Sequence, residues 1–277
     1  MLARHLDKIH FRCNICGQHN EADASSIHRE MLLCRNCTSC ARFRGIAKAV
    51  IGHILKMNPT LAVLSECSSD SSITGIGMSD SDVYAKELSR LFHYTNTFYH
   101  TDPYLDIASK TSSLSYRGLD FVICSDVLEH VEGPVDFAIA NIFDMLIPGG
   151  HLILTVPYVE GFSSIEHYPH YHTAKILEID GSYALINKRI DGQIELHRNP
   201  CFHGGPGSVL EMRIFGEGEL MSMLRYHGFE VIEVLEPRDE AIGYIWSDEV
   251  ENVLTRNRRN KSYVLVCQRP TDRGDGR

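Results

Sequence analysis

The sequence predicts an α/β protein with a doubly wound, mostly parallel sheet, because short apolar segments alternate with helical segments along most of its 277 residues. Residues 119–158 show this most clearly. An apolar strand, acid-rich turns, a helical segment and a Pro-Gly-Gly break come there before another apolar strand. Strands that alternate with helices imply parallel pairing through helical crossovers.

The individual elements follow from hydrophobic periodicity and from turn residues. The expected helices are 41–55, 82–92, 134–146 and 217–228, with helical turns at 126–131. The expected strands are 61–67, 93–100, 119–125, 149–157, 229–234 and 262–268. A loop rich in Ser, Gly and Asp is expected at 68–80, and a hairpin is expected around Asp191 and Gly192.

Composition and charge limit the possible partners. An apolar content of 43% and a charged content of 23% are ordinary for a soluble globular chain, and no apolar run is long enough to span a bilayer, so no membrane partner is expected. The N-terminus lacks the features of a secretion signal, so a cytoplasmic location is expected. A net charge of -9 argues against a nucleic-acid partner, because such binding depends on neutralising phosphates.

Five of the nine cysteines fall close together near the N-terminus. Cys13 and Cys16 form one Cys-x2-Cys pair, and Cys34 and Cys37 form a second pair after seventeen intervening residues. Two thiolate pairs at this spacing suit tetrahedral Zn²⁺, and four protein thiolates leave no position for water, so a structural zinc is predicted. Cys40 is an alternative to Cys37 as a ligand. The other interpretation is reduced thiols without a metal, but so short a segment has little else to hold it together.

Three parts of the chain are therefore expected. Residues 1–42 should form a zinc-binding, zinc-ribbon-like module. Residues 43–268 should form the main domain, with an inserted lid at about 160–213. The tail at 269–277 has nothing to bury and is expected to be disordered.

Three segments carry a resemblance to a known family. The segments "SDVLEHV", "LIPGGHLILTVPY" and "LRYHGFEVIEV" resemble class I S-adenosylmethionine-dependent methyltransferases of the broad small-molecule, type-11-like kind. The resemblance covers roughly 61–268 and is most specific over 120–157. It implies a Rossmann-like sheet with S-adenosylmethionine bound at the carboxyl ends of the strands. The cofactor-binding residues that it implies are Glu66, Ser68, Tyr99, Asp106, Ser125, Asp126 and His130.

The roles follow by position in the family. Glu66 matches the end of the first strand, where the cofactor loop begins, and Ser68 follows it in that loop. Asp106 matches the acid that accepts from the adenine amino group, although it can equally be a turn acid. Ser125 and Asp126 match the strand end that lines the sulfonium.

The chain departs from the family pattern in two places. The family usually has a glycine-rich loop after its first strand, whereas this chain reads "SECSSDSSITGIG". It also often has an acid after the second strand, where this chain has none until Asp102, so Tyr99 is a candidate to lie against the adenine. These two departures bear on individual contacts with the cofactor more than on the predicted fold.

Histidines gather in the expected insert. Imidazoles titrate near neutral pH, so they suit removal of a proton from a hydroxyl acceptor. Most of these histidines can equally have a purely structural role, and His130, after the 119–125 strand, can equally be a packed core residue. The candidate catalytic residues are His167, His170, His172, His203 and His130.

The resemblance implies an enzyme that transfers a methyl group to a small or carbohydrate-type acceptor, at oxygen. A second interpretation is RNA base methylation, because a four-cysteine module before a methyltransferase domain is similar to certain ribosomal-RNA guanine methyltransferases. Arg42, Arg44 and Lys48 would then form a basic stripe. A third interpretation is a zinc-bearing scaffold without catalysis, whose serine-rich loop has lost cofactor binding.

Overall fold

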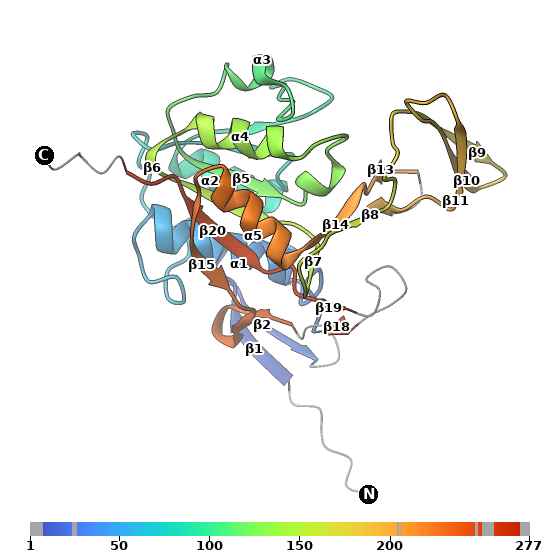
Figure 1. Ribbon diagram of the computed structural model, residues 1–277. Coiled ribbons are helices and arrows are strands. Elements are labelled where there is room, and N and C mark those ends of the chain that lie inside the picture. Colours follow the sequence, from blue (N-terminus) through green and yellow to red (C-terminus); the bar gives the residue numbers. More distant parts are fainter. Residues whose placement is uncertain are drawn as a thin grey trace, which may run out of the picture.

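The central feature of the protein is a six-stranded sheet in the order β15-β20-β6-β5-β3-β4 (Figure 1). The computed structural model describes residues 8–23, 27–203, 205, 207–246, 249–250 and 258–271. Strands β4, β3, β5 and β6 pair in parallel, and β20 is antiparallel to both of its neighbours. The strands are β3 (Thr74–Met78), β4 (His93–Thr97), β5 (Leu119–Ser125), β6 (Leu146–Thr155), β15 (Glu230–Leu235) and β20 (Val264–Gln268). The sheet is mostly parallel, as the sequence predicts.

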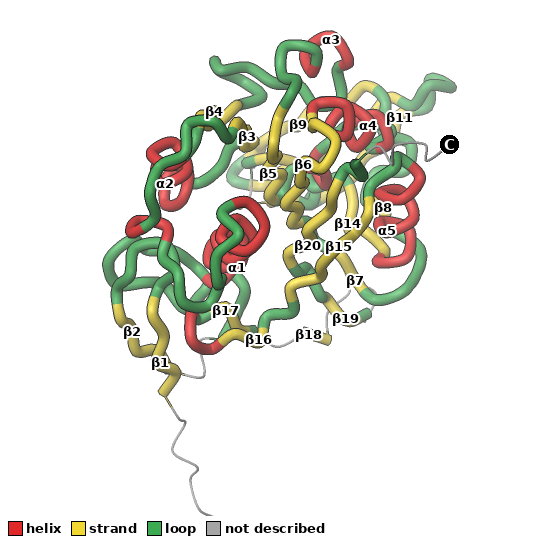
Figure 2. Tube along the Cα trace, turned by 90° about the vertical axis from the view of Figure 1, so that its left-hand side faces the viewer, coloured by secondary structure: helices red, strands yellow, loops and turns green. Residues whose placement is uncertain are grey.

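Helices lie on both faces of this sheet. Helices α1 and α2 lie on one side and α4 and α5 on the other (Figure 2). Across the described residues, no helix is both long and apolar enough to cross a bilayer. The helices are α1 (Ala41–Ala49) with its π-helical continuation η2 (Val50–Ile54), α2 (Asp82–Leu91), α3 (Lys110–Ser113), α4 (Asp136–Met145) and α5 (Glu217–Tyr226). Short 3₁₀ turns are η3 (Leu64–Glu66), η4 (Leu128–His130) and η5 (Glu240–Ile242).

The first strand of the sheet is not where the sequence predicts it. Residues 61–67 contain the turn η3 instead of a strand, and β3 lies inside the segment expected to be a loop. The sequence does not indicate this strand because it contains two glycines, and glycine normally weakens a strand. A Cβ atom on Gly75 would lie 2.3 Å from the ring of Phe121 on β5, so only glycine allows the two strands to pack as they do.

The N-terminal segment packs directly against the sheet domain. Strands β1 (Lys8–Arg12) and β2 (His19–Asp23) form an antiparallel hairpin. Cys13 and Cys34 are buried in the same hydrophobic core as the sheet. Arg44 on α1 is also fully buried, and its guanidinium donates to the carbonyls of Leu32 and Gly243, both at 2.8 Å. The expected module at 1–42 and the main domain therefore share one core.

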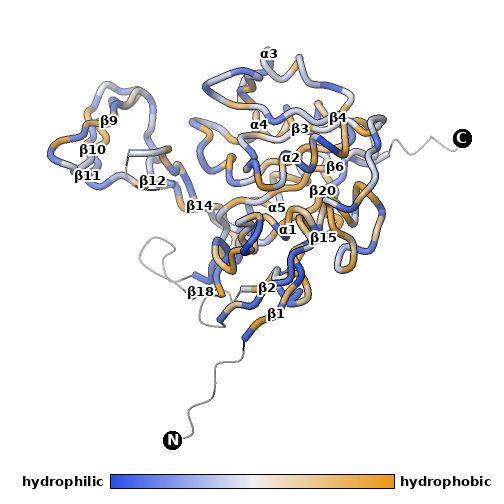
Figure 3. The backbone as a smooth tube through the Cα atoms, turned by 180° about the vertical axis from the view of Figure 1, so that it is seen from behind, coloured by the Kyte–Doolittle hydropathy of each residue, from blue (hydrophilic) through white to orange (hydrophobic). Residues whose placement is uncertain are grey.

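The segment between β6 and α5 contains small sheets. Strands β9, β10 and β11 form an antiparallel meander that extends away from the body (Figure 1), and β10 with β11 is the hairpin expected around Asp191 and Gly192. Apolar residues gather along the central sheet, whereas the meander carries polar and apolar residues together (Figure 3). The strands of these sheets are β7 (Tyr158–Val159), β8 (Ile165–Glu166), β9 (Thr173–Ile179), β10 (Ser182–Lys188), β11 (Ile194–Arg198), β12 (Phe202–His203), β13 (Val209–Leu210) and β14 (Arg213–Gly216). Later short strands are β16 (Arg238–Asp239), β17 (Tyr244–Ile245), β18 (Glu249–Val250) and β19 (Arg259–Asn260).

The ordered chain continues beyond the expected boundary at residue 268. The backbone N–H of Arg269 donates to the carbonyl of Gly150 at 2.9 Å. Its guanidinium donates to the carbonyls of Leu146 at 2.8 Å and Phe143 at 3.2 Å. The expectation of a disordered tail is therefore wrong at Arg269, because this side chain binds the end of α4 and the start of β6. Residues 272–277 of that expected tail lie outside the described residues.

We predict that Gly75→Ala destabilises the protein by about 1–3 kcal/mol, because the added methyl group overpacks the Phe121 ring. Urea unfolding measures this change. Gly52→Ala is the matched control, because a Cβ atom there meets only Pro59 at an ordinary 3.7 Å. Equal stabilities for the two variants would show that β3 and β5 do not pack as closely as described.

Candidate functional site

The candidate site lies at the carboxyl ends of β3 and β5. The chain passes from β3 to β4 on one side and then returns to β5 on the other side of β3, which makes this edge a topological switch point. Open α/β sheets bind ligands at such points. The polar residues that end or directly follow β3, β5 and the neighbouring β6 there are Ser79, Asp80, Ser125, Asp126 and Thr155.

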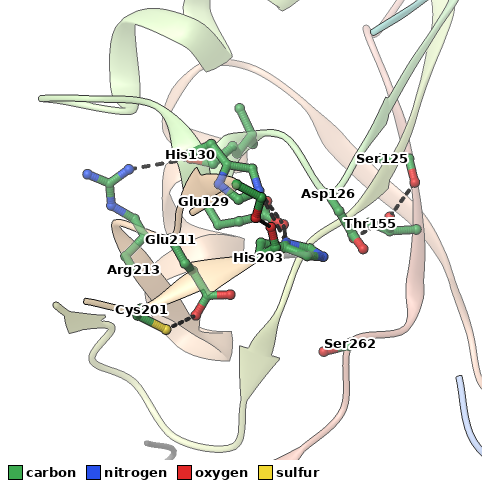
Figure 4. A network of polar contacts seen from close by, with 12 residues as sticks. Ser125, Asp126, Glu129, His130, Thr155, Cys201, His203, Glu211, Arg213 and Ser262 are labelled. Carbon is green, nitrogen blue, oxygen red and sulfur yellow. Dashed lines mark hydrogen bonds and ion pairs between the residues drawn. The ribbon is translucent and has the colours of Figure 1, made fainter. Parts of the chain in front are cut away.

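Asp126 is the centre of a buried ion-pair network. Two nitrogens of Arg29, from the N-terminal segment, donate to its carboxylate oxygens at 2.6 and 2.8 Å. Arg42 of α1 lies 3.4 Å from the same carboxylate and donates to Ser125 at 2.6 Å. The hydroxyl of Thr155 donates to Asp126 at 2.8 Å (Figure 4). Burial alone would raise the pKa of Asp126, but the charges of Arg29 and Arg42 outweigh burial and hold the pKa below its usual value.

Glu30 completes the network with a second carboxylate. Arg42 lies 2.6 Å from one of its oxygens, and Arg29 lies 3.1 Å from it. Within the described part of the chain, the Nε atom of Arg29 is buried and has no hydrogen-bond partner. The edge therefore holds two guanidinium groups, two carboxylates and one unsatisfied donor. Arg29 and Glu30 are far from β5 in sequence, and no motif indicated them.

Asp80 lies beside this network in the loop after β3. Its carboxylate accepts a hydrogen bond from Tyr84 at 2.8 Å and another from Tyr94. Burial raises the pKa of Asp80 to about 6, although both tyrosines oppose this. A Cβ atom on Gly77 would lie 1.9 Å from the carboxylate, so Asp80 folds back onto its own strand. Ser79 has a φ of 57°, in the left-handed region that favours glycine.

The structure brings only some of the expected cofactor residues to this edge. Ser125 and Asp126 end β5 there. Tyr99 and Asp106 lie in the loop after β4, where Tyr99 is exposed and Asp106 accepts a hydrogen bond from the backbone N–H of Ala108 at 2.9 Å. The second contact is that of a turn acid.

Glu66 and Ser68 lie at the opposite end of the sheet. Arg90, near the C-terminal end of α2, donates to the carbonyls of Leu64 and Cys67 at 2.6 and 3.0 Å, and this end of the helix precedes the start of β4. Glu66 pairs there with Arg12 at 2.5 Å. The expectation that these residues begin the cofactor loop is wrong, because residues 61–67 contain the turn η3 and no strand of the sheet.

The five candidate histidines separate into three places. His130 on η4 and His203 on β12 meet at 3.1 Å and flank the buried Glu129 (Figure 4). Nε2 of His167 donates to the carboxylate of Glu211 at 3.0 Å. The other two, His170 and His172, are exposed at the start of the meander, and His170 pairs with Glu195 at 2.9 Å.

The four cysteines predicted as zinc ligands converge. The Sγ atoms of Cys13 and Cys37 are 3.6 Å apart, as are those of Cys16 and Cys34. All four lie within 4.8 Å of one another. Tetrahedral zinc with Zn–S bonds of about 2.3 Å places sulfur atoms about 3.8 Å apart, so the cluster fits the ion. Cys40 lies outside it and contacts Glu30 at 3.4 Å.

The basic stripe considered for RNA binding is not present on the surface. Arg42 belongs to the Asp126 network, and Arg44 is fully buried. Lys48 pairs with Asp239 at 2.7 Å. These three side chains therefore make contacts within the protein. The expectation that they form a basic stripe for RNA is wrong.

A scan against protein-family models gives no match, and neither does a search of curated proteins. Among solved structures, the chain is similar to the glycopeptide N-methyltransferase MtfA complexed with S-adenosylmethionine, at 11% identity over 82% of this chain and 94% of that chain, with a TM-score of 0.41. It is similar to CalS10, an amino pentose methyltransferase from Micromonospora echinaspora, at 12% identity over 83% and 95%, with a TM-score of 0.38. The 1,6-didemethyltoxoflavin-N1-methyltransferase of Burkholderia thailandensis is 12% identical over 82% and 78%, with a TM-score of 0.40. Likenesses this distant assign no activity to the chain.

We predict that Cys34→Ser lowers the zinc content of the purified protein by one ion per chain, measured by elemental analysis. Because Cys34 is part of the shared core, the unfolding midpoint of the whole chain should fall with it. Cys40→Ser is the control and should keep the ion. Loss of zinc from Cys40→Ser, with retention in Cys37→Ser, would contradict this ligand set.

We predict that Arg29→Met destabilises the protein by about 3 kcal/mol, because it leaves the buried Asp126 carboxylate with one cation fewer. Arg35→Met, at an exposed position of the same segment, should change stability by less than about 0.5 kcal/mol. In an Asp126→Asn background the cost of Arg29→Met should shrink. Equal costs in both backgrounds would show that Arg29 stabilises the chain through other contacts.

Proposed function

We propose that the protein is an S-adenosylmethionine-dependent methyltransferase that binds its cofactor at the carboxyl ends of β3 and β5. The single observation that carries this proposal is the pair of guanidinium groups at the switch point, with the buried Nε of Arg29 lacking a partner among the described residues. An unsatisfied buried donor is costly, and an anionic ligand group would satisfy it. The resemblance of the 120–157 segment to methyltransferases supports the same edge.

The charges at this edge match the methionine part of the cofactor. A free amino-acid group carries a carboxylate and an ammonium group side by side, and the edge offers guanidinium and carboxylate groups side by side. Arg29 and Arg42 would hold the carboxylate, and Asp126 or Glu30 would accept from the ammonium group. Tyr99 and Asp106, in the loop after β4, remain the proposed contacts for the adenine.

The reaction that this site supports best is methylation of an oxygen atom on a small or carbohydrate-type acceptor. The cofactor supplies an electrophilic methyl group, so the chain must orient the acceptor in line with that group, exclude water and receive the acceptor's proton. The 160–213 insert is the proposed lid over the acceptor. Its His203, together with His130, lies next to the end of β5 and is therefore placed better than the exposed His170 and His172 to act on the acceptor (Figure 4).

A second candidate function is that of a zinc-bearing scaffold without catalysis. One observation favours it: the chain's own side chains already occupy the switch point. Asp80 folds onto Gly77, and Asp126 is already paired with Arg29. In a scaffold these contacts would be permanent, whereas in an enzyme a ligand would compete with them.

We predict that calorimetric titration with S-adenosylmethionine shows one site per chain, with a dissociation constant between about 1 μM and 1 mM. The enzyme and scaffold readings differ on this point because only an enzyme needs the cofactor. Absence of binding in the wild-type protein would support the scaffold and contradict the proposed methyltransferase.

We predict that Asp106→Ala weakens cofactor binding about tenfold or more, because a lost hydrogen bond to a charged group costs about 1.5–3 kcal/mol. Asp144→Ala is the control, since Asp144 is an exposed aspartate near the end of α4, before the start of β6. The same titration checks both variants. An unchanged affinity for Asp106→Ala would leave Asp106 as a turn acid only.

A further inference from the structure

We propose that Glu129, His130 and His203 bind a divalent metal ion of the zinc class, at a second metal site distinct from the four-cysteine cluster. The first two residues are adjacent on η4, and the third comes from β12 in the insert. The ligand atoms of the three side chains lie within 4.8 Å of one another. The site would therefore join the insert to the end of the sheet that carries Asp126.

The distances between the three ligand atoms match the size of a metal site. Nδ1 of His203 lies 3.1 Å from Nε2 of His130 and 3.3 Å from Oε1 of Glu129. The remaining separation, from Nε2 of His130 to Oε1 of Glu129, is 3.8 Å. Zinc bonds of about 2.0–2.2 Å in tetrahedral geometry place ligand atoms about 3.3–3.6 Å apart. A small closure of the third distance completes the geometry.

The hydrogen bonding of His130 leaves the correct nitrogen available. Its Nδ1 lies 2.6 Å from the carbonyl oxygen of Leu210. A carbonyl can only accept, so Nδ1 carries the proton, and Nε2 presents a lone pair toward His203 and Glu129. Metal-binding histidines are usually fixed in this way by a backbone carbonyl behind the ring.

Glu129 supplies the second, independent observation. Its side chain is fully buried, and among the residues that the structure describes neither carboxylate oxygen accepts a well-formed hydrogen bond, the ring nitrogens of His203 and His130 lying 3.3 and 3.8 Å from Oε1. Arg213, whose guanidinium lies against the same turn, donates to the carbonyls of Leu128, Val131 and Gly133. A buried carboxylate that has only these two long contacts is unfavourable, and a coordinated cation would remove this cost.

A neighbouring cluster is the alternative location for such an ion. His167, Cys201 and Glu211 also bring their ligand atoms within 4.8 Å of one another. In this second cluster, however, Glu211 already pairs with His167 at 3.0 Å and contacts Cys201 at 3.8 Å. All three side chains are only partly buried, so they do not need an ion.

Three protein ligands leave a coordination position open, which is the arrangement of catalytic rather than structural zinc sites. This last step rests on the proposed function: an acceptor hydroxyl bound in the open position would give up its proton more readily. His130 and His203 would then act as ligands instead of as proton acceptors.

The test is the zinc content of the full-length protein, without S-adenosylmethionine, after dialysis against zinc and then against zinc-free buffer. We expect about two zinc ions per chain in the wild type and about one in Glu129→Gln and in His203→Ala. His170→Ala is the matched control and should keep two, because this exposed histidine pairs with Glu195 and belongs to neither cluster. Added zinc should also raise the Tm of chelator-treated wild type more than that of chelator-treated Glu129→Gln.

Two outcomes would overturn the proposal. The first is equal zinc content and equal response to zinc in the wild type and Glu129→Gln, which would make the cluster an ordinary hydrogen-bonded group. The second is loss of the second ion from Cys201→Ala or Glu211→Gln but not from Glu129→Gln, which would place the ion in the neighbouring cluster. Neither outcome depends on cofactor binding, so failure here is distinct from failure of the methyltransferase proposal.

Discussion

Asp126 directly follows β5, and its carboxylate is buried. Two arginines from outside the sheet neutralise this carboxylate. A carboxylate this deeply buried needs cations at short distance, and Arg29 and Arg42 supply them. Arg29 belongs to the N-terminal segment and Arg42 to the first helix. The ion pair therefore fixes the position of the N-terminal segment on the sheet.

This constraint couples the four-cysteine cluster to the candidate site. Arg29 lies between β2 and Cys34, so its backbone belongs to the segment that the four cysteines enclose. Removal of an ion held by the four cysteines would disturb the position of Arg29, and with it the charge at the carboxyl end of β5. The N-terminal segment therefore contributes a residue, Arg29, to the candidate site. Its shared core with the sheet, through Cys13 and Cys34, is consistent with this role.

The proposed acceptor side is held by contacts of the insert with η4. Three residues after Asp126, Glu129 on η4 is buried without a hydrogen-bond partner among the described residues, and His203 of the insert closes over it. The backbone N–H of Met212 also donates to the carbonyl of Glu129 at 2.8 Å. The insert is thus held against the end of β5 by both backbone and side-chain contacts. Two charged groups within one short turn, Asp126 and Glu129, organise the two halves of the proposed site.

Sequence patterns identified the parts of the site that depend on local spacing. The paired cysteines and the Ser125-Asp126 strand end could be predicted because each lies in one short motif. The first strand could not be predicted, because it contains Gly75 and Gly77. Phe121 and Asp80 leave no room for a side chain at these two positions, and only the folded chain shows these contacts.

The charge partners could not be predicted for a related reason. Arg29 and Asp126 are 97 positions apart, and no local pattern relates them. Glu129 appeared only as part of the "SDVLEHV" motif, and its lack of donors is a property of its burial. The misplacement of Glu66 and Ser68 followed from the missed strand, since a shift of the first strand moves every residue assigned to its end.

The central claim is that the network around Asp126 is a cofactor site. A crystal structure with S-adenosylhomocysteine bound tests it most directly. The account predicts the methionine carboxylate within hydrogen-bond distance of Arg29 or Arg42, at the carboxyl ends of β3 and β5. A structure in which the ligand lies elsewhere, or in which Arg29 and Asp126 remain paired with no ligand at that edge, would contradict the account.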